Sequence, residues 1–352
     1  MKQPVFVVGC PRSGTTLLYS MLVAAGGFAF YRKETYFYDL VPRFPRLASA
    51  RARQAFLDRF LAGYLGKVPG LDVVPIARQA IDQSRTTIEF LPRLMSAITS
   101  EQGMERWIEG TPVHVIYMDI IARTVPDALF VHVIRDGRDC ALSTERQGWA
   151  PTLSFDKSRR VGVAALLWEW MVRAGRRFGR THPRAYMEVR FEQLIDDPHA
   201  ALSAVGQFLD HDLDVERIAA NPVHALKNPN TSFREERTRG EFNPIGRWKS
   251  ADADDIRLCE SLTGRFLDQL GYERAYPVQS GPTVEALRMR AMYFGMFEVK
   301  HLLKAYTPVG RFVTSTRVWD EQPKAGEAPV RPIARVATSG THDRGMLPGV
   351  AR

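Results

Sequence analysis

The residues best suited to chemistry stand near the N-terminus, in a segment that could hold a phosphate. Gly9-Cys10-Pro11-Arg12-Ser13-Gly14-Thr15-Thr16 has the spacing of a G-x-x-x-x-G-K-[ST] phosphate loop, with Thr15 in the place of the lysine. A loop of small residues that enters a helix directs backbone N–H groups and the positive end of the helix dipole at an anion. Hydroxyls at Ser13, Thr15 and Thr16 add donors, and Arg12 adds a fixed cation. The alternative is a plain glycine turn between a strand and a helix.

The missing lysine narrows the kind of ligand. In ATP-binding loops a lysine reaches the β and γ phosphates, and no strand ending in Asp supplies a magnesium site here. The pattern therefore favours a ligand with one 5'-phosphate that carries a short anionic group, bound without metal. The runner-up is a P-loop NTPase or nucleotide kinase with a degenerate loop. A third class is a non-catalytic nucleotide-binding protein.

Four blocks of the sequence follow one another in a recognisable order. The four blocks are Pro11-Arg12-Ser13-Gly14-Thr15-Thr16, Arg135-Asp136-Gly137-Arg138-Asp139 with Ser143, Phe191-Glu192-Gln193-Leu194 with Asp197-Pro198, and Gly246-Arg247-Trp248-Lys249. In order and in spacing they resemble the signatures of the sulfotransferase family, which uses 3'-phosphoadenosine 5'-phosphosulfate (PAPS). The resemblance covers about residues 4–274 and points to the branch of bacterial, Golgi-type carbohydrate and tyrosylprotein-like P-loop sulfotransferases.

The resemblance implies a set of contacts to the nucleotide. Arg135 and Ser143 would grip the 3'-phosphate, although Arg135 could instead pair with Asp136 or Asp139. Phe191 stands where a tyrosine is usual, so an aromatic face remains without the hydroxyl. The block Gly246, Arg247, Trp248 and Lys249 would close over the same phosphate; alternatively, Trp248 is a core anchor and Lys249 is solvated.

Transfer of the sulfuryl group to a hydroxyl or amine by in-line displacement requires a base and a cation at the leaving oxygen. Glu34 is the first candidate base, because its surroundings resemble the K-E-x-x-[FY]-F element of relatives that use a glutamate; the alternative is an exposed ion pair with Lys33 or Arg32. His114 is the competing base. Arg12 and Lys33 are the candidate cations.

One further element departs from the family pattern. Trp107-Ile108-Glu109-Gly110-Thr111-Pro112 resembles a W-x-x-K-T-P element, with Gly110 where many relatives carry lysine. Any catalytic lysine at that position is therefore lost.

Short apolar strands alternating with helical patterns predict an α/β fold. Apolar runs at 5–8, 130–134 and 186–189 each precede a helical pattern. We expect a P-loop-type three-layer α/β/α domain with a central parallel sheet over residues 1–275. A helical extension at 276–320 and a disordered tail at 321–352 complete the predicted organisation. Helical segments around 50–65 and 86–102 are expected to roof a substrate cleft.

Composition limits the partners. The 352 residues include 48 Lys and Arg against 39 Asp and Glu, which favours anionic ligands. No basic stripe with interleaved aromatic residues and no zinc-finger or RNP-like motif appears, so nucleic acid is not an expected partner. Three scattered cysteines give no disulfide framework or zinc pair, and no metal cofactor is expected. Without a signal peptide or a membrane span, the expected location is the cytoplasm.

The acceptor is left open by the sequence. A small molecule, a glycan or a lipid would each suit a pocket built by residues 28–110 and the segment after 276. Residues 284–306 combine an apolar cluster with flanking Arg and Lys residues, which indicates either peripheral membrane contact or packing on the catalytic domain or a dimer partner. The sequence does not indicate an oligomeric state.

Overall fold

The computed structural model describes residues 1–30, 34–44, 46–61, 71–156, 159–221, 243–277 and 283–313. Lys33, one of the candidate cations, and the predicted tail at 321–352 lie outside the described residues.

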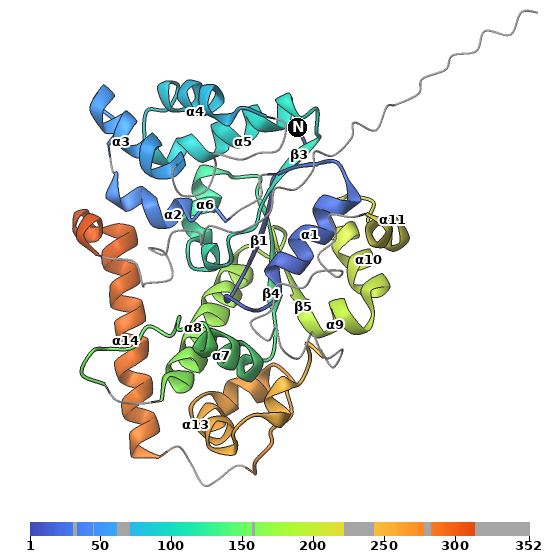
Figure 1. Cartoon of the computed structure of the whole chain (residues 1–352), viewed down its shortest axis with the longest axis vertical. Helices are drawn as coiled ribbons and strands as arrows, with labels where there is room; N and C mark the ends of the chain where they lie inside the picture. The colour runs from blue at the N-terminus through green and yellow to red at the C-terminus, as the bar shows by residue number, and fades with distance from the viewer. Residues whose placement is uncertain are drawn as a thin grey trace, which may run out of the picture.

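A five-stranded parallel sheet forms the centre, with strand order β2-β3-β1-β4-β5 (Figure 1). The three apolar runs are β1, β4 and β5, as predicted. The two strands on the other side of β1 were not predicted, because β2 is two residues long and β3 carries a charge at each end. The strands are β1 Val5–Gly9, β2 Phe28–Ala29, β3 Arg106–Glu109, β4 Leu129–Ile134 and β5 Tyr186–Arg190.

Alternate residues of β1 enter different cores, because successive side chains of a strand point to opposite faces. Val5 and Val7 belong to one hydrophobic cluster, and Phe6 and Val8 belong to the other. The first cluster is covered by α1 Thr15–Ala25, α9 Phe191–Asp196, α10 Pro198–Leu209 and α11 Val215–Ala220. Helices therefore cover both faces of a parallel sheet, which confirms the three-layer α/β/α architecture.

The second face carries the larger layer (Figure 1). The expected helical segments around 50–65 and 86–102 contain α3 and α5. The helices of this layer are α2 Phe37–Leu40, α3 Ala50–Phe60, α4 Val73–Asp82, α5 Phe90–Glu101, α6 Met118–Thr124, α7 Gly137–Arg146, α8 Arg160–Thr181 and α13 Ala253–Gln269, with the short 3-10 helices η1 Val41–Arg43, η3 Thr87–Glu89, η4 Pro112–Ile116 and η6 Arg247–Ser250.

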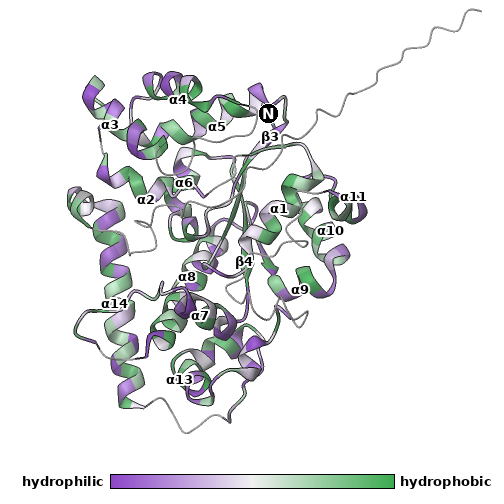
Figure 2. Ribbon diagram, in the orientation of Figure 1, coloured by the Kyte–Doolittle hydropathy of each residue, from purple (hydrophilic) through white to green (hydrophobic). Residues whose placement is uncertain are grey.

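The helix predicted at 284–306 is present as α14 Val284–Tyr306, followed by η7 Pro308–Phe312. It packs against α8, and Met289, Tyr293 and Phe297 are buried in the same core as the sheet. The Met and aromatic cluster therefore packs on α8 and the core of the sheet domain. Hydrophobic and hydrophilic residues alternate along α14 (Figure 2). Its solvent side exposes Val299, Leu302, Leu303 and Tyr306.

None of the helices in the described part of the chain is long and apolar enough to cross a membrane.

Candidate active site

The loop between β1 and α1 has the backbone conformation of an anion cradle. Gly14 has φ 97°, and a Cβ at this position would lie 2.2 Å from Cδ2 of Phe191, so only glycine fits. The side chain of Ser13 is buried, and its Oγ has no hydrogen-bond partner among the described residues. A buried hydroxyl without a partner costs about 1–3 kcal/mol. No side chain caps the N-terminus of α1 either, so a phosphate in this loop would satisfy both groups.

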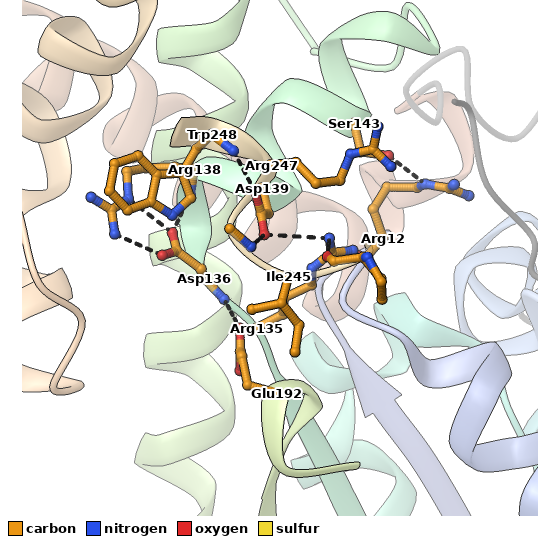
Figure 3. A network of polar contacts seen from close by, with 12 residues as sticks. Arg12, Arg135, Asp136, Arg138, Asp139, Ser143, Glu192, Ile245, Arg247 and Trp248 are labelled. Atoms are coloured by element: carbon orange, nitrogen blue, oxygen red, sulfur yellow. Dashed lines mark hydrogen bonds and ion pairs between the residues drawn. The ribbon is translucent and has the colours of Figure 1, made fainter. Parts of the chain in front are cut away.

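The end of β4 brings a second basic group to the same place, because β1 and β4 are adjacent parallel strands. Nη1 of Arg135 donates to the carbonyl of Arg12 at 3.1 Å, and its guanidinium lies 4.5 Å from the ring centre of Phe191. Nε of Arg12 donates to Oγ of Ser143 at 3.0 Å (Figure 3). The structure thus joins the loop to the residues expected at the 3'-phosphate.

Arg135 also forms the charge pair that the sequence left as an alternative. Its Nη2 lies 3.4 Å from Oδ2 of Asp139, and the same nitrogen donates to the carbonyl of Pro244. Its Nε is buried without a hydrogen-bond partner among the residues that the structure describes. The charge pair therefore leaves one donor of this guanidinium for a ligand.

Asp139 fixes the late G-x-W-[RK] segment onto α7. Its carboxylate accepts from the backbone N–H groups of Gly246 at 3.0 Å and Trp248 at 2.9 Å (Figure 3). Trp248 is half-buried, with the guanidinium of Arg138 3.4 Å from its ring centre, so it is not a core anchor. Lys249 is exposed. This arrangement places Gly246 beside the end of β4.

Arg247, on the same segment, completes a group of three guanidinium groups with Arg12 and Arg135 (Figure 3). Burial and the charge of Arg135 lower the pKa of Arg247 to about 10. Burial, followed by repulsion from Arg135, also lowers the pKa of Arg12 below its ordinary value. Cations crowded in this way repel one another, so a ligand with several negative charges would be bound strongly here.

Glu34 lies close enough to Arg12 for their charges to interact. Burial and the neighbouring carboxylate of Glu109 raise the pKa of Glu34 to about 8, and Arg12 opposes this rise. The hydroxyl of Tyr36 donates to Oε2 of Glu34. Glu34 is therefore a half-buried carboxyl poised to exchange a proton near neutral pH, and it is not an exposed ion-pairing residue.

Glu109 is a residue of the site that the sequence did not single out. It is fully buried at the end of β3 and accepts from Oγ1 of Thr35 at 2.9 Å, from the backbone N–H of Thr111 at 3.1 Å and from the hydroxyl of Thr111. The backbone N–H of Thr35 donates in turn to Oγ1 of Thr111 at 2.8 Å. This network ties the residue after Glu34 to the sheet. The sequence held no clear signal for this residue, because β3 is four residues long and is charged at both ends.

His114 is the third member of this buried network. Its Nδ1 lies 2.8 Å from Oε2 of Glu109, and the histidine is fully buried. Although burial raises the pKa of Glu109, the opposing effects of His114 and of the hydrogen bonds from Thr111 bring it below its ordinary value. The two side chains therefore form a buried charge-assisted pair.

The glycine in the W-x-x-K-T-P element has a local explanation. A Cβ at Gly110 would lie 2.5 Å from Cδ2 of Tyr19, a residue of α1. The ring of Tyr19 thus occupies the space that the Cβ of a lysine at this position would need.

A partly open cavity of about 90 Å³ lies beside the phosphate loop. One water needs about 10–15 Å³ on this measure, so the cavity has room for an organic ligand. Pro11 of the loop and Thr144, next to Ser143, form part of its wall. Among the described residues of the region 28–110, Asp39 alone lines the cavity. The segments η4, α8 and α14 supply most of the other lining residues.

Among the described residues no group of three or more His, Cys, Asp or Glu side chains is placed to hold a metal ion.

The parallel α/β fold places three arginines beside a phosphate-type loop, an arrangement suited to an anion with several negative charges. The sequence pattern of the sulfotransferase family matches residues 4–215, more than half of the chain. The chain therefore belongs to the sulfotransferase family. It is a transferase of the EC 2.8.2 type, and PAPS is its sulfuryl donor.

Solved structures with the same fold include the sulfotransferase domain of the olefin synthase of Synechococcus PCC 7002. It is 18% identical, with a TM-score of 0.50 over 79% of this chain and 98% of that one. The sulfotransferase domain of the curacin biosynthetic pathway is 18% identical, with a TM-score of 0.47 over 78% and 99%. A sulfotransferase from Mycobacterium avium is 15% identical, with a TM-score of 0.46 over 78% and 79%. No curated protein sequence matches the chain.

Proposed function

We propose that this enzyme transfers the sulfuryl group of PAPS to a hydroxyl or amine of a small acceptor, with Glu34 as the general base. The observation that carries the proposal is the convergence of the phosphate loop, three arginines and a carboxyl of raised pKa at the edge of one sheet. PAPS supplies the sulfuryl group, and adenosine 3',5'-bisphosphate is the leaving group.

The geometry of the loop supports the proposed donor-binding residues. Ser13, Gly14, Thr15 and Thr16 would hold the 5'-phosphate through backbone N–H groups and hydroxyls, in line with the buried, unsatisfied Oγ of Ser13. The other contacts would come from residues around the end of β4. They are Arg135, Ser143, Phe191, Gly246, Arg247, Trp248 and Lys249.

Phe191 and Lys249 would each make a weaker contribution to donor binding than the other residues. Phe191 offers its ring to Gly14 and to the guanidinium of Arg135, so it shapes the cradle without a polar contact. Lys249 is exposed, and it would contribute as a mobile charge at the rim.

In the reaction the acceptor oxygen forms a bond to sulfur while the bond from sulfur to the bridging phosphate oxygen breaks. Glu34 accepts the proton of the acceptor hydroxyl, for which a pKa of about 8 is well matched. Arg12 lies inside the loop and would stabilise the negative charge on the leaving oxygen. Lys33 would be a second cation if it reaches the same oxygen.

Two observations favour Glu34 over His114 as the base. His114 is fully buried, and its Nδ1 is engaged by Glu109. Glu34 is half-buried and close to Arg12. We therefore assign His114 and Glu109 to the support of the Glu34 segment.

Calorimetric titration with adenosine 3',5'-bisphosphate, compared with ATP plus magnesium, tests the donor site. We expect tight binding of the bisphosphate that chelator does not weaken, and weak binding of ATP. Preference for ATP with magnesium would point to the alternative, a P-loop NTPase or nucleotide kinase. Bisphosphate binding without transfer to any acceptor in a broad panel would point to a non-catalytic binding protein.

A further inference from the structure

The cavity beside the phosphate loop is lined mainly by apolar side chains, with polar residues contributed by two different segments. The apolar lining is made of aliphatic and aromatic side chains from several elements. The phosphate loop and the neighbouring helix α7 contribute Pro11 and Thr144. The wall made by α14 carries Lys300, His301 and Lys304. The apolar lining residues are Val113, Ile116, Tyr117, Trp149, Pro151, Leu167, Trp170, Met171, Met296 and Phe297.

Two of the charged groups in the wall neutralise each other. The ammonium group of Lys304 donates to Oδ1 of Asp39, and the hydroxyl of Tyr117 donates to the same oxygen at 3.2 Å. Both Lys304 and Asp39 are buried, so this pair is a fixed part of the wall. It contributes no net charge to the cavity.

Lys300 is different. It is half-buried, it lines the cavity, and it makes no hydrogen bond or ion pair with any residue that the structure describes. Burial lowers the pKa of Lys300 below its ordinary value, while the carboxylate of Asp39 opposes the effect. Lys300 lies one turn of helix before Lys304, on the same face of α14, so its positive charge adds to a wall in which the Lys304–Asp39 pair is already neutral. Next to it, Nδ1 of His301 is buried without a hydrogen-bond partner among the described residues.

We propose that the acceptor is an apolar molecule that carries the reacting hydroxyl at one position and a carboxylate at another, and that Lys300 binds this carboxylate. The inference rests on the proposed function, because the hydroxyl is assigned to the end of the cavity next to the donor loop. Among the described residues of the cavity wall, Lys300 is the cation without an ion-pair partner, and a single negative charge on the acceptor would match it. His301 supplies a second donor to the carboxylate through Nδ1.

The proposal gives α14 a role in acceptor selection. The helix begins after the part of the chain that matches the family pattern, which ends at residue 215. The apolar side chains of Met296 and Phe297 and the charge of Lys300 stand on one face of it. The charge of the acceptor would therefore be recognised by a segment outside the part of the chain that matches the family pattern.

A binding experiment on the full chain, saturated with adenosine 3',5'-bisphosphate, tests this inference. The panel consists of ω-hydroxy fatty acids of several lengths and hydroxyphenylalkanoic acids, each paired with its neutral amide. The best acid should bind roughly 10- to 100-fold more tightly than its amide, because a charge-assisted hydrogen bond is worth that much. The same preference should appear in kcat/KM when PAPS is the donor.

Two variants of α14 make the assignment specific. Lys300→Met keeps most of the apolar stem and removes the charge, so it should abolish the preference for acids and leave binding of the amides unchanged. Arg288→Met removes a charge from an exposed position of the same helix, where Arg288 pairs with Glu285, and should keep the preference. Thermal unfolding of each variant verifies that the fold is retained.

The outcomes separate this inference from the proposed function. Equal binding of acids and amides, or no binding of either, with normal bisphosphate affinity overturns the acceptor class and leaves the sulfotransferase assignment intact. A preference for acids that survives Lys300→Met overturns the role of Lys300. Loss of bisphosphate binding in the parent protein would instead remove the proposed function itself.

Discussion

Replacing Glu34 by glutamine should stop the reaction and, at the same time, stabilise the protein at pH 8. Between pH 4.5 and about 8 the folded protein retains a proton on Glu34 that the unfolded chain has released. The folded state then binds more protons than the unfolded state, so the free energy of unfolding falls as the pH rises through this window. Glutamine carries no titrating group, so the variant escapes this loss.

The size of the effect follows from the pKa of Glu34. One pKa unit corresponds to about 1.4 kcal/mol, so a rise from 4.5 to about 8 sets a ceiling of about 5 kcal/mol. Water reaches a half-buried side chain and screens its interactions, which reduces the expected gain to about 1–3 kcal/mol. The gain of Glu34→Gln over the parent should be small at pH 5 and should reach this value at pH 8.

Urea unfolding of the parent and the variant at pH 5, 6.5 and 8 measures the gain directly. Glu101→Gln, at an exposed position on α5, controls for the chemical substitution. Turnover of PAPS with a responsive acceptor should fall roughly 100- to 10,000-fold in Glu34→Gln, while bisphosphate affinity is retained. If parent and variant lose stability in parallel between pH 5 and pH 8, Glu34 does not have a raised pKa. Near-normal turnover would remove it as the base.

Three other substitutions test the donor site and its support. Arg135→Met should weaken the binding of adenosine 3',5'-bisphosphate roughly 10- to 100-fold and leave the binding of adenosine 5'-phosphate nearly unchanged. Equal losses of affinity in titrations with both nucleotides would mean that the substitution has disrupted the phosphate loop. Glu109→Gln removes the negative charge that raises the pKa of Glu34, so the acid limb of the pH–rate profile should move to lower pH; an unmoved limb would contradict this. Gly110→Lys should lower the free energy of unfolding by about 1–3 kcal/mol through its clash with Tyr19. In a double-mutant cycle, Tyr19→Ala should relieve part of that loss, and purely additive losses would refute the clash.

The donor side of the site could be predicted from the sequence because it is built from local units. The phosphate loop follows β1 directly, and Arg135 follows β4 directly. Neighbouring parallel strands end at the same edge of a sheet, so Arg12 and Ser143 meet although 131 residues separate them. Each unit could be recognised in the sequence from a short apolar run and the polar residues that follow it.

The residues that hold the Glu34 segment in place, above all Glu109, could not be predicted in the same way. Glu109 is the last residue of β3. The four residues of this strand begin and end with a charge, so no apolar run in the sequence indicated a strand here. The carboxylate of Glu109 is satisfied by Thr35, 74 residues earlier in the chain. A buried glutamate is recognisable only when its partners are known, because unpaired burial of a carboxylate is too costly to expect.

Helix α8 was also absent from the predicted elements. It contains Gly162, Gly175 and Gly179, which lower the intrinsic preference for a helix. A Cβ at Gly175 would lie 2.4 Å from the ring of His132, so glycine there permits close packing of the helix on β4. Tertiary packing, rather than local propensity, therefore stabilises this helix.

The acceptor pocket shows why family membership fixes the donor and leaves the acceptor open. Most of the proposed donor contacts lie where β1, β4 and β5 end, at one edge of the sheet, so neighbouring strands hold them together. The cavity instead combines the loop, η4, α8 and α14, and its charge is set by Lys300 on a helix outside the matched pattern. A substitution on α14 can change the charge of the cavity without disturbing the phosphate loop. Acceptor preference in this enzyme should therefore respond to changes in α14 that leave bisphosphate affinity constant.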